Sequence, residues 1–245
     1  MSSAKEIAQN IAKIKKRIET ACIKAGRNPD EVRLLLATKT VEAERIALAF
    51  DAGERLIGEN KMQEVKEKYE ALQPLPHEKH FIGHMQTNKV KEALRYGVTC
   101  IQSVDRMRLA ERLQRRLEFE DKQMDVLIQV NTSFEESKFG MAPDKAVEFV
   151  KAVAQMDRIH IKGLMTIGLF SAETEKVRRC FRLLRDIRDE VEALHLPGVE
   201  MRELSMGMSG DLETAIEEGA TIVRVGTAIF GERPYPDSYY WNEGR

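Results

Sequence analysis

Residues 32–40 read VRLLLATKT, a short apolar run that ends in a lysine. Arg33 is the one charged residue in this stretch before Lys39, and a continuous apolar run of this length is typical of a strand buried on both faces, as in a parallel sheet. Lys39 falls where that strand should end. At the C-terminal mouth of an α/β barrel such a lysine can react, because a desolvated amine loses its proton more readily and attacks carbonyl carbons. The alternative is a surface lysine that caps the strand or reaches the next helix.

Composition limits the class of protein. The chain has 245 residues, 42% of them hydrophobic, and a net charge of -1, which provides for a core and gives no basic excess for nucleic acid. No apolar run has the length of a membrane span and the first residues contain no secretion signal, so we expect a cytoplasmic protein without a membrane partner. Cys22, Cys100 and Cys180 are widely spaced, as expected of reduced thiols in a cytosol.

The rest of the chain alternates strands and helices. An apolar stripe predicts an amphipathic helix over residues 3–26, formed by Ile7, Ile11, Ile14 and Ile18. Short apolar segments predict strands at 32–39, 56–60, 80–84, 100–104, 125–132, 159–168, 203–207 and 221–226. Eight strands with crossover helices use up the chain, so we predict a single α/β domain over 1–245, a (β/α)8 TIM-like barrel. Residues 1–30 would dock on it as an extra N-terminal helix and 232–245 would be a C-terminal tail; an open doubly wound sheet is the alternative.

Residues 205–219, SMGMSGDLETAIEEG, follow the seventh predicted strand. In a barrel, function lies where strands end and loops begin. Small residues, with Ser205 and Ser209, stand before a predicted helix, where unpaired backbone N–H groups bind phosphate. The alternative is an ordinary helix cap formed by Ser209, with Asp211 complementing the helix dipole.

Residues 223–231, VRVGTAIFG, follow the eighth predicted strand. Gly226 allows close backbone approach and Thr227 offers a hydroxyl, and barrels often bind phosphate at the loops after strands seven and eight. Arg224 alternates with apolar neighbours, so it should point into the barrel, where a buried guanidinium needs an acceptor. A carboxylate such as Glu59 or Glu203 is the ordinary candidate.

Six segments together resemble one known family. They are ATKT (37–40), GEN (58–60), HFIGHMQTNK (80–89), LMTIG (164–168), LSMGMSGD (204–211) and RVGTAIFG (224–231). In this order they closely resemble the pyridoxal phosphate homeostasis family, also called the proline synthetase co-transcribed proteins. The resemblance departs at position 84, where this chain has His and many members have Pro. The family's fold resembles the barrel domain of alanine racemase without its second domain.

The resemblance implies a binding site for pyridoxal 5'-phosphate. Lys39 would form the Schiff base with the cofactor. Arg224 would face the pyridine nitrogen, and Asn60 and Met165 would line the ring. The phosphate would be held by Ser205, Ser209, Gly226 and Thr227.

The expected function is cofactor binding rather than robust catalysis. A guanidinium only donates hydrogen bonds, so Arg224 would leave the ring nitrogen unprotonated and weaken the cofactor as an electron sink. A racemase needs acid–base groups on both faces of the substrate carbon. Lys39 would serve one face, but the sequence shows no clear second base: the tail residues Tyr235, Tyr239 and Tyr240 are candidates, and packing at the barrel edge is their more ordinary role. We therefore expect a protein that stores or delivers pyridoxal phosphate in vitamin B6 homeostasis. The alternatives are an amino-acid racemase of low activity and a Schiff-base aldolase that uses Lys39 without cofactor.

The expected partners follow from that function. They are pyridoxal phosphate itself and apo-enzymes that take it up, with a monomer or weak dimer as the assembly. No metal is expected, because two of His77, His80 and His84 lie in or beside a proline-rich loop that offers no defined ligand geometry.

Overall fold

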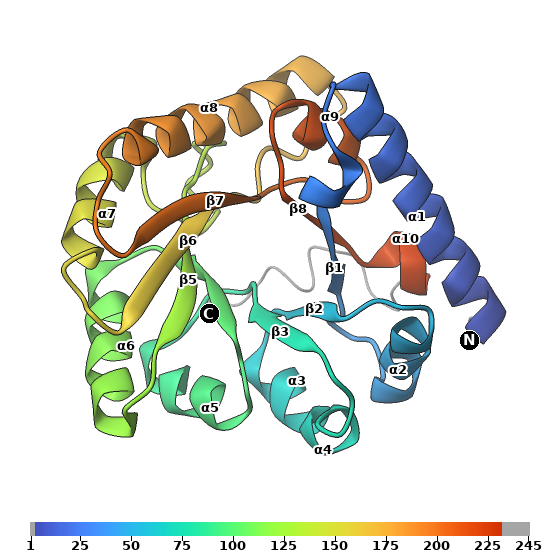
Figure 1. The fold of residues 1–245 in the computed structure, drawn as a ribbon, viewed down its shortest axis with the longest axis horizontal. Helices are drawn as coiled ribbons and strands as arrows, with labels where there is room; N and C mark the ends of the chain where they lie inside the picture. Colours follow the sequence, from blue (N-terminus) through green and yellow to red (C-terminus); the bar gives the residue numbers. More distant parts are fainter. Residues whose placement is uncertain (1–2, 232–245) are drawn as a thin grey trace.

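Eight parallel strands close into a barrel. The computed structural model describes residues 3–231, and in it the strands follow one another in chain order around the barrel (Figure 1). The strands are β1 (Arg33–Ala37), β2 (Leu56–Glu59), β3 (Glu78–Phe81), β4 (Cys100–Val104), β5 (Met124–Gln129), β6 (Ile159–Met165), β7 (Val199–Ser205) and β8 (Ile222–Val225). Pairing of β1 with β8, with Leu36 opposite Val225, closes the barrel. The predicted barrel is confirmed, and the alternative of an open sheet is wrong.

Helices connect successive strands and cover the outside of the barrel (Figure 1). They are α1 (Ala4–Lys24), α2 (Ala43–Asp51), α3 (Met62–Glu67), α4 (Tyr69–Leu72), α5 (Val90–Arg95), α6 (Met107–Glu120), α7 (Ala146–Val153), α8 (Thr174–Glu192), α9 (Leu212–Glu217) and α10 (Thr227–Phe230). Short 3-10 turns occur at η1 (Pro29–Glu31), η2 (Thr87–Lys89) and η3 (Pro143–Lys145). Apolar residues on these helices and on the outward faces of the strands form the main core.

Two strands begin at least two residues earlier than predicted. β3 starts at Glu78 and ends at Phe81, not at 80–84, and β7 starts at Val199 rather than at 203. Both contain charged residues near the N-terminal end of the barrel, where polar side chains reach solvent and pair with neighbours. Glu200 of β7, for example, accepts a hydrogen bond of 2.8 Å from Lys162 of β6. Because these residues are charged, the starts of the two strands could not be recognised from apolar runs in the sequence.

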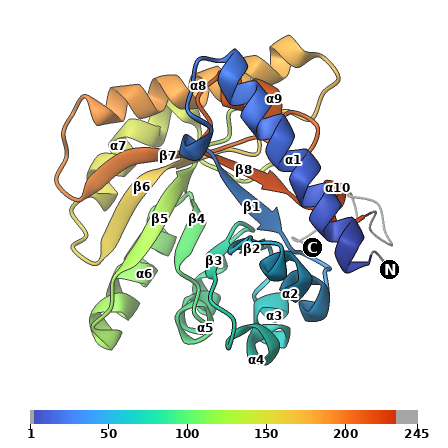
Figure 2. The same cartoon turned by 45° about the vertical axis from the view of Figure 1, so that its right-hand side comes forward.

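Helix α1 covers the seam between the first and last strands. Ile7, Ile11, Ile14 and Ile18 are buried, as the predicted apolar stripe requires. Figure 2 shows α1 lying beside α9 and α10. Two long-range hydrogen bonds hold it there: Asn10 Nδ2 donates to the Ile229 carbonyl at 3.1 Å, and Arg17 Nε donates to Glu213 at 2.7 Å. The helix at the start of the chain is therefore fastened to elements from its last quarter.

Two further observations apply to residues 3–231. The three cysteines are buried free thiols. No helix in this range combines the length and the apolar composition that crossing a bilayer requires.

Candidate functional site

Lys39 lies just beyond β1, at the mouth of the barrel. Its side chain is 8% exposed. Ala37 stands opposite Gly58 in the register between β1 and β2, so Lys39 and Asn60 each lie two residues beyond a paired position on neighbouring strands. Thr40 follows with a φ of 63°, a left-handed conformation that is uncommon outside glycine. The chain therefore turns sharply immediately after the lysine.

A buried ion cluster lies behind this turn. Lys68 Nζ donates to Glu59 Oε1 at 2.7 Å and to Glu64 Oε2 at 2.8 Å. Glu59 is 1% exposed, and burial raises its pKa to about 7 although Lys68 opposes that rise. Breaking such a buried pair is costly, because the remaining charge has no compensation. This cluster was not predicted, since the segment around Lys68 has the charged composition of a solvated helix.

The cluster fixes the two residues that flank Lys39. Thr38 Oγ1 donates to Glu59 Oε1 at 2.7 Å, and the Thr38 carbonyl accepts from Lys68 Nζ at 2.8 Å. On the other side, the Thr40 N–H donates to Glu64 Oε2 at 2.6 Å. Lys39 is thus carried by a turn that is fastened at both ends, which limits where its amine can lie.

Arg224 points into the barrel, as predicted, and is 6% exposed. Its Nη1 donates to Ser205 Oγ at 2.8 Å and its Nη2 to the Thr166 carbonyl at 2.7 Å. Both acceptors are neutral, so the expectation of a carboxylate partner at Glu59 or Glu203 is wrong. Burial lowers the pKa of Arg224 to about 10. A buried cation with neutral acceptors is suited to an electron-rich or anionic ligand, because the remaining N–H groups only donate.

The loop after β7 is organised by its own carboxylate. The Met208 N–H donates to Asp211 Oδ1 at 2.6 Å, and Asp211, not Ser209, occupies the cap position of α9. Burial raises the pKa of Asp211. Ser209 is half-buried, and its carbonyl accepts from Arg17 at 2.9 Å. Gly207 has a φ of 90°, a conformation that favours glycine.

The loop after β8 lies against the loop after β7. The Arg224 N–H donates to the Gly207 carbonyl at 2.9 Å, which joins the two glycine-bearing segments. Gly226 is buried and precedes α10, a helix too short to be predicted, and Thr227 is exposed as its first residue. The barrel therefore brings together the two segments for which a phosphate role is predicted.

Asn60 and Met165 line other sides of the mouth. Asn60 is half-buried, and its backbone lies so close to Gly83 that a Cβ added there would be 2.0 Å from the Asn60 carbonyl oxygen. Met165 is 1% exposed and stands opposite Ser205 in the register between β6 and β7. The backbone approach at Gly83 fixes Asn60 and could not be recognised from sequence spacing alone.

Loops after β5 and β6 are tied to each other at the mouth. Lys138 Nζ donates to the Gly168 carbonyl at 2.8 Å and pairs with Glu135. Phe139 stacks on His84 with 3.9 Å between ring centroids. The second lysine near the mouth is thereby engaged in loop–loop contacts.

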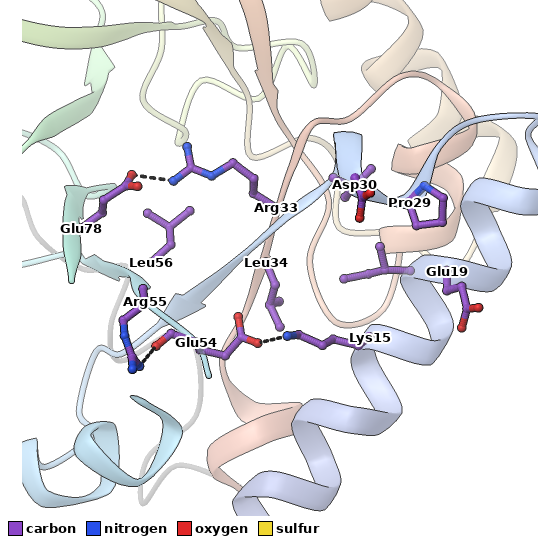
Figure 3. A pocket seen from close by; sticks show the side chains of 12 residues that line it. Lys15, Glu19, Pro29, Asp30, Arg33, Leu34, Glu54, Arg55, Leu56 and Glu78 are labelled. Atoms are coloured by element: carbon purple, nitrogen blue, oxygen red, sulfur yellow. Dashed lines mark hydrogen bonds and ion pairs between the residues drawn. The ribbon is translucent and has the colours of Figure 1, made fainter. Parts of the chain in front are cut away.

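A separate cavity of about 510 Å³ lies at the opposite end of the barrel. Figure 3 shows its lining from α1, β1 and the starts of β2 and β3. Lys15 pairs there with Glu54, and Arg33 with Glu78. It contains none of the predicted site residues.

Among residues 3–231, no three His, Cys, Asp or Glu side chains come together as a potential metal-ligand set. The tail tyrosines Tyr235, Tyr239 and Tyr240 lie outside the described residues.

Known proteins share this fold and sequence. The family model described as alanine racemase, N-terminal domain, matches residues 3–234. The pyridoxal phosphate homeostasis protein of Aquifex aeolicus is 44% identical over 227 residues, which cover 93% of this chain and 98% of that protein. The structure of PipY from Synechococcus elongatus with PLP bound is 31% identical, with a TM-score of 0.80 over 92% of this chain and all of that one. Alanine racemase of Clostridium difficile shares the fold at 12% identity, with a TM-score of 0.72 over 95% of this chain and 57% of the enzyme.

The fold and the mouth with its buried lysine define an alanine racemase-like barrel. The identity and coverage above then place the chain within that class. It belongs to the pyridoxal phosphate homeostasis protein family, as its sequence motifs predict.

Proposed function

We propose that this protein binds pyridoxal 5'-phosphate covalently through Lys39 and takes part in intracellular vitamin B6 homeostasis. The observation that carries the proposal is the mouth itself: a buried lysine at one strand end and a buried arginine with neutral acceptors at another. The relative with PLP bound, at 31% identity over the same barrel, supports the choice of cofactor.

Each residue has a defined task in this proposal. Lys39 supplies the amine that holds the cofactor's aldehyde carbon. Arg224 directs an N–H at the ring nitrogen, and Asn60 and Met165 flank the ring. The phosphate is held by the loops after β7 and β8, through Ser209, Gly226 and Thr227, with Ser205 at their base. Bound pyridoxal phosphate supplies an electron sink for reactions of amino acids.

Arg224 makes strong catalysis unfavourable. The guanidinium donates to the ring nitrogen and has no site to accept a proton, so it keeps the nitrogen unprotonated. We therefore propose storage or delivery of cofactor to apo-enzymes as the physiological role. The second candidate is slow amino-acid racemisation, which the alanine racemase-like barrel favours.

Borohydride trapping tests the covalent attachment. Protein loaded with pyridoxal phosphate, reduced and digested, should carry the reduced adduct on the peptide that contains Lys39. Lys39→Ala should abolish the adduct. Lys138→Met is the matched control, because that mouth lysine is engaged by Gly168 and Glu135 and should leave the Lys39 adduct intact. Absence of a Lys39 adduct in the unaltered protein, or trapping of a sugar phosphate instead, would refute the assignment.

Two kinetic measurements separate storage from catalysis. Exchange of the α-proton of alanine in deuterated water reports racemase chemistry, and many turnovers per site would overturn the non-catalytic proposal. Reactivation of a PLP-dependent apo-enzyme by the loaded protein, compared with free pyridoxal phosphate at the same total concentration, reports delivery. A rate set only by spontaneous release would contradict a delivery role.

A further inference from the structure

A row of buried polar side chains crosses the barrel interior beneath the mouth. Arg224 Nη1 donates to Ser205 Oγ at 2.8 Å, and Ser205 Oγ donates to Gln102 Oε1 at 2.6 Å. Gln102 Nε2 lies 2.8 Å from His80 Nδ1. These residues come from β8, β7, β4 and β3, so the row spans the barrel rather than following one strand. Gln102 and Ser205 are fully buried, and a buried amide or hydroxyl must keep its partners.

The direction of every bond in this row follows from Arg224. A guanidinium only donates, so Ser205 Oγ accepts from it and turns its own hydrogen to Gln102 Oε1. The amide nitrogen of Gln102 therefore faces His80, whose Nδ1 must accept. A neutral imidazole that accepts at Nδ1 carries its hydrogen on Nε2.

The far end of the row agrees with that tautomer. His80 Nε2 lies 3.7 Å from Glu78 Oε2, and Glu78 also pairs with Arg33 (Figure 3). A carboxylate attracts an N–H and repels a lone pair, so Nε2–H is favoured on this side of the ring. The row therefore runs in one direction, from the arginine at the mouth to an ion pair near the other end of the barrel.

We propose that Gln102 is a positioning residue for Arg224, acting through Ser205. The amide takes the Ser205 hydrogen, which leaves the serine lone pairs facing the guanidinium and holds Nη1 in one orientation. The Thr166 carbonyl holds Nη2, so both terminal nitrogens of Arg224 are held and the direction of its remaining N–H groups is fixed. The inference rests on the proposed function for the ligand of Arg224, which is the ring nitrogen of pyridoxal phosphate. The directions of the hydrogen bonds among Arg224, Ser205, Gln102 and His80 do not depend on that function.

The first test needs no cofactor. Nitrogen-15 NMR of histidine-labelled protein distinguishes the two imidazole tautomers. His80 should show a protonated Nε2 and a bare Nδ1. Gln102→Met, which keeps the side-chain length and removes both hydrogen bonds, should convert the signal to a tautomer mixture. Ser103→Ala is the matched control: Ser103 is the next residue on β4, equally buried, and its hydroxyl has no hydrogen-bond partner among residues 3–231. A protonated Nδ1 in the unaltered protein would overturn the proposal.

The second test asks whether the row reaches the site. Gln102→Met should weaken pyridoxal phosphate binding roughly three- to tenfold, the effect of one neutral hydrogen bond, and alter the absorption spectrum of the bound cofactor. His80→Asn and His80→Leu form a nearly isosteric pair; the Asn oxygen can replace Nδ1 as acceptor, so Asn should bind within twofold of the unaltered protein while Leu should not. Equal affinities for the pair would overturn the proposal. If borohydride traps no adduct on Lys39 of the unaltered protein, the proposed covalent attachment is refuted, but the tautomer result for His80 is unaffected.

Discussion

Replacing Lys68 with Met should destabilise the protein more at alkaline than at mildly acidic pH. Lys68 compensates the buried carboxylate of Glu59, whose pKa burial raises from 4.5 to about 7. A carboxyl whose pKa is raised on folding stabilises the protein below its unfolded pKa, and that stability is lost as pH rises through the folded pKa. The unaltered protein should therefore lose stability between about pH 4.5 and pH 7 from this group, and lose no more above pH 7.

In Lys68→Met the loss should continue above pH 7. Without the ammonium, the pKa of Glu59 rises further, and each additional pH unit costs about 1.4 kcal/mol. At pH 6 the variant should lose about 2 kcal/mol through the missing hydrogen bonds to Glu64 and to the Thr38 carbonyl. At pH 8.5 it should lose about 4 kcal/mol, within the range for breaking a buried ion pair.

Urea unfolding at the two pH values measures this difference. Lys176→Met is the control, because Lys176 pairs with Glu173 on the surface and should cost less than about 0.5 kcal/mol at either pH. Adding Glu59→Gln to Lys68→Met should remove the pH dependence of the loss. Equal losses at pH 6 and pH 8.5 in the single variant would refute the reasoning about Glu59.

Three further predictions concern other parts of the barrel. Gly83→Ala should displace the Asn60 backbone by roughly 1 Å, since the new Cβ would otherwise lie 2.0 Å from its carbonyl oxygen; pyridoxal phosphate affinity, measured by titration, should fall on the order of 100-fold, the effect of such a displacement on site geometry. Ile11→Ala should lower the free energy of unfolding by roughly 2–5 kcal/mol, because Ile11 is 2% exposed under α1; a loss below about 1 kcal/mol in urea would mean that α1 is loosely docked. Unfolding measured over an acid pH series should show a stabilising contribution from Glu78, whose pKa falls from 4.5 to about 2 because His80 and Arg33 face its carboxylate. This contribution to the free energy of unfolding is present above pH 4.5, is lost as the pH falls towards 2, and should be absent in Glu78→Gln.

The barrel was predictable because most of its strands are short, mainly apolar runs in the sequence. Residues 34–36 and 100–104 are buried on both faces and mainly apolar, as is typical of parallel strands in a barrel, and the isoleucine stripe of α1 has helical spacing. Strand boundaries were less predictable where charged residues such as Glu78 pair near the barrel end. There, polar composition and strand conformation coexist because the side chains still find partners.

The sequence predicted where the site residues lie in the barrel better than it predicted their hydrogen-bond partners. Alternation with apolar neighbours correctly pointed Arg224 inwards, but its acceptors are a serine hydroxyl and a backbone carbonyl. Backbone acceptors leave no trace in side-chain composition. Gln102 was missed for a related reason: one amide within an apolar strand does not reveal which of its faces is buried or what crosses the barrel to meet it.

Attachment of α1 to the end of the chain constrains how the molecule can be made. The groups that anchor it, Glu213 and the Ile229 carbonyl, lie 196 residues after Arg17 and 219 residues after Asn10, so they are synthesised much later than the helix. During that interval the apolar face of α1 has no partner from α9 or α10, and exposed apolar surface on a nascent chain is prone to aggregation. A circular permutation that encodes α1 directly after α10 would shorten that interval while keeping the hydrogen bonds of α1 to Glu213 and to the Ile229 carbonyl.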